Sequence, residues 1–402
     1  MIYRLMKKIR VGILFGGRSG EHEVSLLSAA SVLQAIDRSK YQVVPIGITK
    51  QGRWVTAGHA ERLLNTAASD KHLRAGDPDA TGPAAVLRKG ESVLVPPVPS
   101  EALVPFEREA GAVTHSSSPE QVLSVDVIFP ILHGTFGEDG TIQGLFELAG
   151  IAYVGSGVLG SAAGMDKDAM KRLFQSAKLP IVKWVTFLRG EWEKNPKKVR
   201  SRIEAALKYP VFVKPANLGS SVGISKAHNA KELPAAMELA AQFDRKIVVE
   251  QGVGGKGKAR ELEVAVLGND EPDASVVGEV VPVREFYDYE AKYLSEGSDL
   301  IVPAKLSKAQ TKQVREMAIA AFRACDCAGL ARVDFLMEPD SRSGKPGRIF
   351  VNEINTLPGF TSISMYPRLW AASGVSYPKL IDRLLELGME RRADKDRNRY
   401  SL

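Results

Sequence analysis

The first fifty residues alternate between strand and helix patterns in an order that few folds permit. Ile9 to Phe15 are predicted to form a buried strand, and a glycine-containing turn over Gly16 to Glu23 follows it. From Val24 to Ile36 the apolar side chains recur at helical spacing, and a second apolar run occupies Tyr41 to Ile48. A strand, a crossover helix and a second strand predict a parallel sheet, so we expect an α/β fold at this end.

The rest of the chain predicts further units. Its 402 residues suggest two to four domains, at about 100 to 200 residues per domain. We predict that the first, a parallel α/β domain, comprises residues 1–155, with a loop-rich insertion near 57–120 that is rich in Ala, Pro, Gly and Ser. A central unit at 156–248 mixes strands and helices. From about residue 249 to 402 the pattern is α+β, with a long helix at 308–324 and a hairpin over 332–355.

Composition excludes several classes of protein. The 54 Lys and Arg are interspersed with 47 Asp and Glu, so the net charge of +7 suits a pocket for anions better than a nucleic-acid surface. The N-terminal apolar run is too short for a signal sequence, and no run approaches the roughly 18 apolar residues of a membrane span. We therefore expect a cytoplasmic protein without membrane attachment. Cys325 and Cys327 are interpreted as reduced packing thiols.

The predicted hairpin contains the clearest candidate site. Side chains alternate along a strand, so Arg332 and Asp334 share one face of its first strand, while Glu353 and Asn355 share one face of the second. The opposite face is apolar. Two acids and an amide offer the hard oxygen ligands that Mg²⁺ prefers, so we interpret this face as a metal site; a solvated polar face is the alternative.

Two lysines stand where local physics does not favour them. Lys167 lies in the first turn of a predicted helix, where the macrodipole disfavours a cation by about 0.3 to 1 kcal/mol. Lys214 ends an apolar strand and precedes Pro215 to Ser221, a loop of small residues whose N–H groups can approach a phosphate. Both are candidate phosphate ligands. The alternative for each is a surface lysine that extends its ammonium group to solvent.

Several further features are ambiguous. The turn after the first strand lacks the G-x-G-x-x-G spacing, and no G-x-x-x-x-G-K-[ST] motif occurs, which disfavours nicotinamide and Walker-type sites. Glu21 is either a functional carboxylate or a helix cap. His133, at a strand end, is either functional or a hydrogen-bonded structural residue. The polar loop from Asn355 to Pro367 either binds an oxyanion or forms only a turn.

Taken together, these motifs resemble the D-alanine–D-alanine ligase family of ATP-grasp enzymes. The resemblance rests on segments that occur in order along nearly the whole chain outside the insertion. They are GGRSGEHEVSL (16–26), LHGTFGEDGTIQG (132–144), GSAAGMDK (160–167), VFVKPANLGSSVGISK (211–226), FYDYEAKY (286–293), ARVDF (331–335) and NEINTLPGFTSISMYP (352–367).

The resemblance implies a three-domain ATP-grasp fold, with ATP between the central and C-terminal domains. It implies that ATP phosphorylates the carboxylate of one D-alanine, that the amine of a second attacks the acyl phosphate, and that ADP and phosphate leave. The product, D-alanyl-D-alanine, is a peptidoglycan precursor. In such chemistry the protein mainly positions charged groups. Two Mg²⁺ ions, replaceable by Mn²⁺, and a homodimer are also implied.

The resemblance further assigns roles to residues of this chain. ATP would be bound by Lys167, Lys214, Ser221, Glu250, Val253, Glu261, Phe286 and Lys292, with the lysines at the phosphates, Glu250 and Val253 at the adenine and Glu261 at the ribose. The metal ligands would be Asp334, Glu353 and Asn355. The catalytic group would comprise Glu21, Ser220, Tyr293, Arg332 and Gly359, and the D-alanines would contact Glu21, His133, Ser364 and Met365.

Two segments depart from the family pattern. Between Gln251 and Arg260 the chain is longer than usual, which makes Glu261 a less secure assignment than Glu250, and the segment 57–120 does not align. Tyr293 favours an amine over D-lactate as the second substrate. The alternatives to a D-alanine–D-alanine ligase are another carboxylate–amine ligase of the same fold, or a nucleotide-binding regulator without catalysis.

Overall fold

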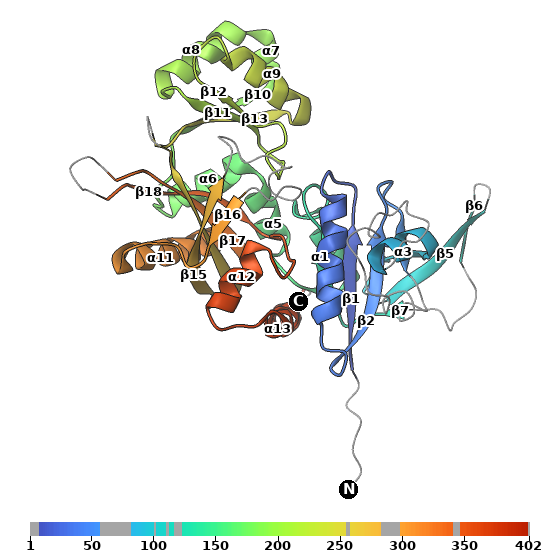
Figure 1. Ribbon diagram of the computed structural model, residues 1–402. Helices are drawn as coiled ribbons and strands as arrows, with labels where there is room; N and C mark the ends of the chain where they lie inside the picture. The colour runs from blue at the N-terminus through green and yellow to red at the C-terminus, as the bar shows by residue number, and fades with distance from the viewer. Residues whose placement is uncertain are drawn as a thin grey trace.

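A computed structural model describes residues 8–56, 82–99, 102–109, 112–115, 123–254, 258–282, 298–340 and 346–400 of the chain. The described strands form three sheets, and each sheet belongs to a separate unit in Figure 1. The N-terminal unit stands on the right of that view, the central unit at the top and the C-terminal unit on the left. This arrangement agrees with the predicted ATP-grasp class, whereas the boundaries at 155 and 248 stay predictions.

The N-terminal sheet contains the predicted parallel strands. Register pairs β1 with β2 and with β8, both in parallel, because α1 (His22–Ala35) crosses over between β1 and β2. The strand–helix–strand prediction is thus confirmed. The order in the sheet is β6 (Ala112–His115), β5 (Ala102–Glu109), β4 (Glu91–Leu94), β3 (Trp54–Thr56), β2 (Tyr41–Ile48), β1 (Ile9–Gly16), β8 (Val127–Ile131) and β9 (Ala152–Tyr153), with β7 (Leu123–Ser124) beside β5.

The segment predicted as a loop-rich insertion contributes to this sheet, so that prediction was wrong in part. It contains α3 (Gly82–Lys89) and the strands β4, β5 and β6, which extend the sheet in antiparallel pairs. Side chains of α3 and β4 are buried in the core. The elements are short and interrupted by Pro and Gly, so neither the helical nor the alternating period persists long enough to be recognised.

Helices cover both faces of the N-terminal sheet. Alternate residues of β1 point to opposite sides: Ile13 packs in one core cluster with α1, while Leu14 packs in another with α4 (Thr141–Ala149). This arrangement explains why β1 is continuously apolar from Val11 to Phe15, since both of its faces are buried there.

The central unit is a small antiparallel sheet covered on one face. Its strands run in the order β10 (Trp184–Leu188), β13 (Lys246–Gln251), β11 (Val211–Pro215) and β12 (Ser225–Ala227). Its core cluster joins these strands to α8 and α9 and to Trp192 of α7. The helices of this unit and of the link from the N-terminal unit are α5 (Val158–Met165), α6 (Lys167–Ser176), α7 (Arg189–Lys194), α8 (Pro196–Ala206) and α9 (Leu233–Phe243).

The C-terminal unit contains the predicted hairpin and the predicted long helix. α11 (Lys308–Ala324) has the predicted bounds and begins with a capping box at Ser307. It packs on a sheet of strand order β16 (Ser298–Ile301), β15 (Asp273–Pro282), β14 (Arg260–Gly268), β17 (Gly329–Met337) and β18 (Ile349–Asn355). Cys325 and Cys327 are buried free thiols beneath this sheet, as expected, and burial raises the pKa of Cys325 to about 12.

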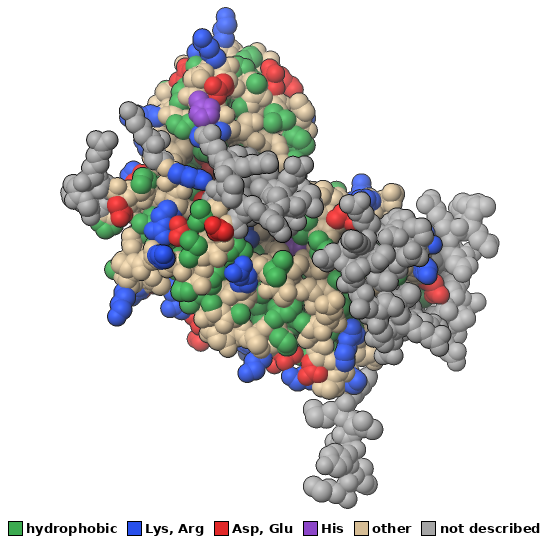
Figure 2. Space-filling model, viewed as in Figure 1, with side chains coloured by type: hydrophobic (Ala, Val, Ile, Leu, Met, Phe, Trp, Pro, Cys, Tyr) green, Lys and Arg blue, Asp and Glu red, His purple; other side chains and the backbone are tan. Residues whose placement is uncertain are grey.

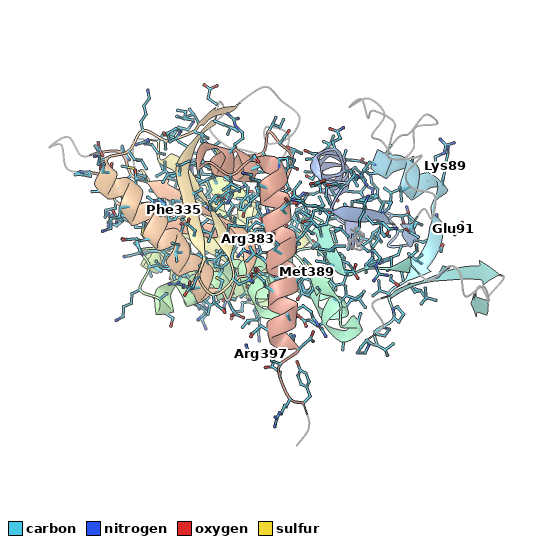
Figure 3. All side chains as sticks on the ribbon, turned by 90° about the horizontal axis from the view of Figure 1, so that it is seen from below. Lys89, Glu91, Phe335, Arg383, Met389 and Arg397 are labelled. Atoms are coloured by element: carbon cyan, nitrogen blue, oxygen red, sulfur yellow. The ribbon has the colours of Figure 1, made fainter. Side chains whose placement is uncertain are left out.

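The last helix joins the N-terminal and C-terminal units. α13 (Tyr377–Lys395) packs in the same core cluster as α1 and α12 (Met365–Ala372). Figure 3 shows α13, marked by Arg383 and Met389 and followed by Arg397, between β17 with Phe335 and the region of Lys89 and Glu91. Leu384 and Leu385 of α13 are fully buried in this joint.

Basic and acidic side chains are mixed on the described surface. On the face drawn in Figure 2, Lys and Arg side chains alternate with Asp and Glu across all three units. Among the described residues, no helix has the length and apolarity needed to cross a bilayer.

The packing around two helical glycines predicts opposite effects of a Gly→Ala substitution on the free energy of unfolding. A Cβ added at Gly388 of α13 would lie 2.8 Å from the Tyr153 carbonyl oxygen, whereas one added at Gly144 of α4 would meet nothing within 4 Å. We expect Gly388→Ala to lower the free energy of unfolding by about 1 to 3 kcal/mol. Gly144→Ala should raise it by about 0.5 to 1 kcal/mol. Urea unfolding measures both, and a stabilised Gly388→Ala chain would contradict the close packing of α13.

Candidate active site

A cavity of about 560 Å³ lies where the three units meet. Its walls come from α1 and the loop after β8 in the N-terminal unit, from the loop after β11 in the central unit, and from the sheet and α12 of the C-terminal unit. Many residues predicted for the site line it together: Glu21, His133, Lys167, Ser220, Arg332, Glu353, Asn355, Gly359, Ser364 and Met365.

Strand register brings the predicted metal ligands side by side. On the hairpin, Asp334 stands opposite Glu353 and Arg332 opposite Asn355. The facing residues Val333 and Ile354 are buried, as the alternation predicts. Two carboxylates and an amide oxygen therefore converge on one face of neighbouring strands, and this donor set matches the hard oxygen ligands of Mg²⁺.

Arg332 is held by two carboxylates. Its Nε and Nη2 donate to Oδ1 and Oδ2 of Asp334, both at 2.7 Å, and its Nε lies 3.1 Å from Oε2 of Glu263. Glu263 stands opposite Asp334 on β14 and also lines the cavity. The sequence analysis missed Glu263. The available signal was alternation, because Glu263 shares a strand face with the predicted Glu261.

Glu21 bonds across the cavity to Ser220, in the loop that follows β11. Its Oε1 accepts a hydrogen bond from the Ser220 hydroxyl, and its side chain does not cap α1. Glu21 thus occupies the N-cap position of α1, but its carboxylate bonds to Ser220 instead of to the helix amides. Gly134 has φ +76°, and a Cβ there would lie 2.8 Å from Oε2 of Glu21, so only glycine permits this approach. Ser220 and Ser221 also have positive φ, at 50° and 60°.

His133 lies beside Glu21 as a neutral donor and acceptor. Its Nδ1 is 3.1 Å from the Leu357 carbonyl oxygen, which can only accept, so Nε2 accepts from Ser28 at 3.3 Å. Burial lowers the pKa of His133, although the Glu21 charge acts in the opposite direction. The sequence left open whether His133 is a functional residue or a hydrogen-bonded structural one. In the structure its ring is hydrogen-bonded to the protein and also lines the cavity.

Glu138, which the sequence analysis did not single out, is a buried acid near Glu21. Burial and the Glu21 charge raise the pKa of Glu138 to about 8. Its Oε2 accepts from the Gly134 amide at 2.6 Å. At neutral pH the group is mainly protonated, so the cavity wall avoids two neighbouring carboxylate charges.

Lysines gather on the side of the cleft that faces the central unit. Lys167 is buried and donates to the Leu218 carbonyl oxygen at 2.6 Å, which rules out the exposed-lysine interpretation. Lys214 donates to Glu250 Oε2 at 2.8 Å, and the Glu250 charge raises its pKa although burial acts the other way. Lys171, one turn after Lys167 on α6, also contacts Glu250; its buried position was not predicted.

The loop after β18 ends at the beginning of α12. Ser364 occupies the N-cap position without making a side-chain capping bond to the helix, and Met365 is the first helical residue. The Ser364 hydroxyl instead accepts from the Thr361 amide at 3.1 Å. The first amides of a helix attract carboxylates and phosphates, so this end of the cavity suits an anionic group.

The remaining predicted residues lie away from the cavity wall or outside the described part of the chain. Six predicted residues are described but do not line the cavity: Asp334, Lys214, Glu250, Val253, Ser221 and Glu261. Of these, Asp334 contacts Arg332 of the cavity wall, and Lys214 and Glu250 contact each other. Phe286, Lys292 and Tyr293 lie outside the described residues.

Comparison with protein families and known structures gives a consistent result. Residues 10–156 match the family described as D-ala D-ala ligase N-terminus, and residues 173–386 match D-ala D-ala ligase C-terminus. The chain is 46% identical over 397 residues to a D-alanine–D-alanine ligase of Natranaerobius thermophilus, covering 98% of each sequence. It is 48% identical to one from Chloroherpeton thalassium, covering 97% of this chain and 99% of the relative.

Solved structures agree. The D-alanine–D-alanine ligase of Coxiella burnetii superposes with a TM-score of 0.76 at 33% identity, covering 97% of this chain and 96% of the other. The VanG D-Ala:D-Ser ligase of Enterococcus faecalis superposes with a TM-score of 0.76 at 35% identity, covering 95% and 100%.

The raised pKa of Glu138 predicts a pH-dependent stability. Between its ordinary value of 4.5 and about 8, the unfolded chain releases the Glu138 proton while the folded chain keeps it. Rising pH therefore favours unfolding across this window, by at most about 1.4 kcal/mol per pH unit. Glu138→Gln cannot ionise, so the unfolding free energy of the unmodified chain should fall relative to this variant from pH 5 to 8. Parallel pH profiles of the two proteins would disprove a protonated Glu138.

Proposed function

We propose that the chain, which belongs to the D-alanine–D-alanine ligase family, joins two D-alanines in the cavity where its three units meet and converts ATP to ADP and phosphate in doing so. The family forms D-alanyl-D-alanine for peptidoglycan synthesis and is ADP-forming. The observation that supports this site most strongly is the convergence of Arg332, Asp334, Glu353 and Asn355 opposite the lysines of the central unit.

The nucleotide is assigned to the cleft between the central and C-terminal units. Lys167 and Lys214, together with Lys292, bind the phosphates, and the loop at Ser221 offers further donors. The base lies at Glu250, near the end of β13, and at Val253, which follows that strand; Glu261 and Phe286 complete the nucleotide site. Buried cations opposite a polyphosphate stabilise the charge that develops during phosphoryl transfer.

Asp334, Glu353 and Asn355 fit a pair of Mg²⁺ ions, because their oxygens are presented by adjacent strands in register. Mn²⁺ accepts the same oxygen ligands. When bound, the metal ions neutralise phosphate charge and orient the terminal phosphoryl group for attack by a carboxylate. Both oxygens of Asp334 accept hydrogen bonds from Arg332, and Glu263 would remain as an anionic partner of Arg332 if Asp334 bound a metal.

The two D-alanines occupy opposite ends of the cavity. Glu21 binds the ammonium of the first, near His133, while Ser220 and Tyr293 orient Glu21. The amine of the second attacks the acyl phosphate carbon. The C–N bond forms first and gives a tetrahedral intermediate, whose oxyanion is stabilised by Arg332 and the Gly359 amide. The C–O bond to phosphate then breaks, and phosphate leaves with the proton that the amine releases. Ser364 and the Met365 amide bind the carboxylate of the second D-alanine at the start of α12.

The principal alternative function is a ligase of the same fold that uses a different second substrate. Similarity to a D-Ala:D-Ser ligase raises D-serine as a second substrate, and D-lactate and L-alanine test the stereochemistry and the nucleophile. We propose D-alanine, and an assay of ADP release with each acceptor separates them. Robust turnover with another acceptor and none with D-alanine would overturn the assignment. A regulator without catalysis would show no ADP release with any of them.

Two assignments concern the protein as a whole. We propose that the enzyme acts in the cytoplasm, where ATP and the amino-acid substrates are available. We also propose that it is a homodimer, which light scattering of the purified chain would test.

Removing a reacting-site charge should abolish most of the activity. We expect Glu353→Gln and Arg332→Ala to lower kcat by about 100-fold or more, the scale of one lost transition-state interaction. Arg348→Ala is the matched control, because Arg348 lies on the same hairpin region with its side chain 75% exposed. Its kcat should stay within about twofold of the parent. An unchanged kcat in Glu353→Gln would refute its role at the metal.

A further inference from the structure

Lys171 is a fully buried cation in the nucleotide cleft. Its side chain is 0% exposed, and it is among the largest completely buried side chains of the described chain. Its Nζ lies 3.2 Å from Oε1 of Glu250 and donates to the Asn352 carbonyl oxygen at 3.4 Å. Lysines are almost never fully buried unless they are paired. Burial lowers the pKa of Lys171, while the Glu250 charge acts to keep it protonated.

Glu250 is shared between two lysines that differ in their surroundings. Lys171, which is buried on α6, contacts Oε1 of Glu250. Lys214 of β11, which directly precedes the loop from Pro215 to Ser221, contacts Oε2. The side chain of Lys214 is 11% exposed. Burial alone would raise the pKa of Glu250, but the two lysine charges lower it to about 2. The carboxylate is therefore ionised in this state.

We infer that Lys171 is a positioning residue for recognition of the adenine base, acting through Glu250. This inference rests on the proposed nucleotide site. A bound phosphate would compete with Glu250 for the N–H donors of the Lys214 ammonium group. When Lys214 turns to the phosphates, Lys171 remains as the partner that keeps Glu250 charged and fixed.

With Lys171 as its partner, Glu250 can discriminate between nucleotide bases. Once Lys214 leaves Oε2, that oxygen can accept a hydrogen bond from the exocyclic amino group of adenine. A 6-oxo base such as hypoxanthine presents a carbonyl oxygen there, and two acceptors repel each other. Without Lys171, Glu250 either keeps Lys214 or becomes protonated, and in both cases the discrimination between the two bases is lost.

Lys171 also links two parts of the site. Its bond to the Asn352 carbonyl joins α6 to β18, immediately before the proposed metal ligand Glu353. The same ammonium thus connects the strand at the base to the strand at the metal, which places both ends of the nucleotide relative to each other.

The test compares binding of ADP and inosine diphosphate to the full chain, by competition with a fluorescent nucleotide. We expect the parent chain to prefer ADP, and Lys171→Met to lose about tenfold or more of that preference, the scale of one hydrogen bond to a charged group. Lys197→Met, an exposed lysine on α8, is the matched control and should retain the preference. Lys171→Arg keeps the charge and should retain most of it.

The outcomes separate this inference from the proposed function. A Lys171→Met chain that binds both nucleotides more weakly but keeps the parent preference would show that Lys171 is only structural. A parent chain that binds ADP and inosine diphosphate equally would refute the adenine role of Glu250 itself.

A second measurement does not depend on a variant that folds. In a crystal structure of the parent chain with ADP and Mg²⁺, we expect Lys214 at a phosphate and Lys171 still within hydrogen-bond distance of Glu250. Lys214 remaining on Glu250, or Lys171 leaving it, would overturn the inference.

Discussion

The pairing of β17 with its two neighbours is the constraint on which the site depends. Glu263 of β14, Asp334 of β17 and Glu353 of β18 form a row across three adjacent strands. A shift of one residue in either pairing would move the charged side chains to the buried face and the apolar ones into the cavity. The apolar residues on the other face, including Val333 and Ile354, pack on the core and so fix the register. Core packing and site geometry are therefore specified by the same alternation.

The site also holds charges in unfavourable surroundings. Lys171 and Glu250 are buried together, and Glu138 is buried near Glu21. Removing one member of a buried ion pair is strongly destabilising, so these groups constrain one another as well as any ligand. The consequence is a rigid arrangement of donors and acceptors before substrate binds, which is what electrostatic catalysis requires. The protonated state of Glu138 relieves part of the repulsion that this arrangement would otherwise create.

Much of this arrangement follows from local sequence patterns, and the rest depends on long-range contacts. The bounds of β2 and α11 agree with their periodicity, and the hairpin acids share a face as alternation requires. Glu263, Lys171 and Glu138 were not identified, because their importance arises from partners that are distant in sequence. Lys171 is a good example: at helical spacing it resembles any lysine on α6, and only its contact with Glu250, on a strand of the central sheet, distinguishes it. The short elements between residues 82 and 115 escaped recognition because they are too brief to establish a period.

The central claim is that the oxygens of Asp334, Glu353 and Asn355 meet at divalent ions beside Arg332. The most direct measurement is anomalous scattering from crystals grown with ADP, Mn²⁺ and a phosphinate mimic of the tetrahedral intermediate. We expect metal peaks bound by these three side chains at roughly 2.1 to 2.2 Å, close to the distances that Mg²⁺ adopts, with Arg332 directed at the phosphinate oxygen. Metal peaks bound elsewhere, or three side chains without a metal in the presence of bound ADP, would contradict it.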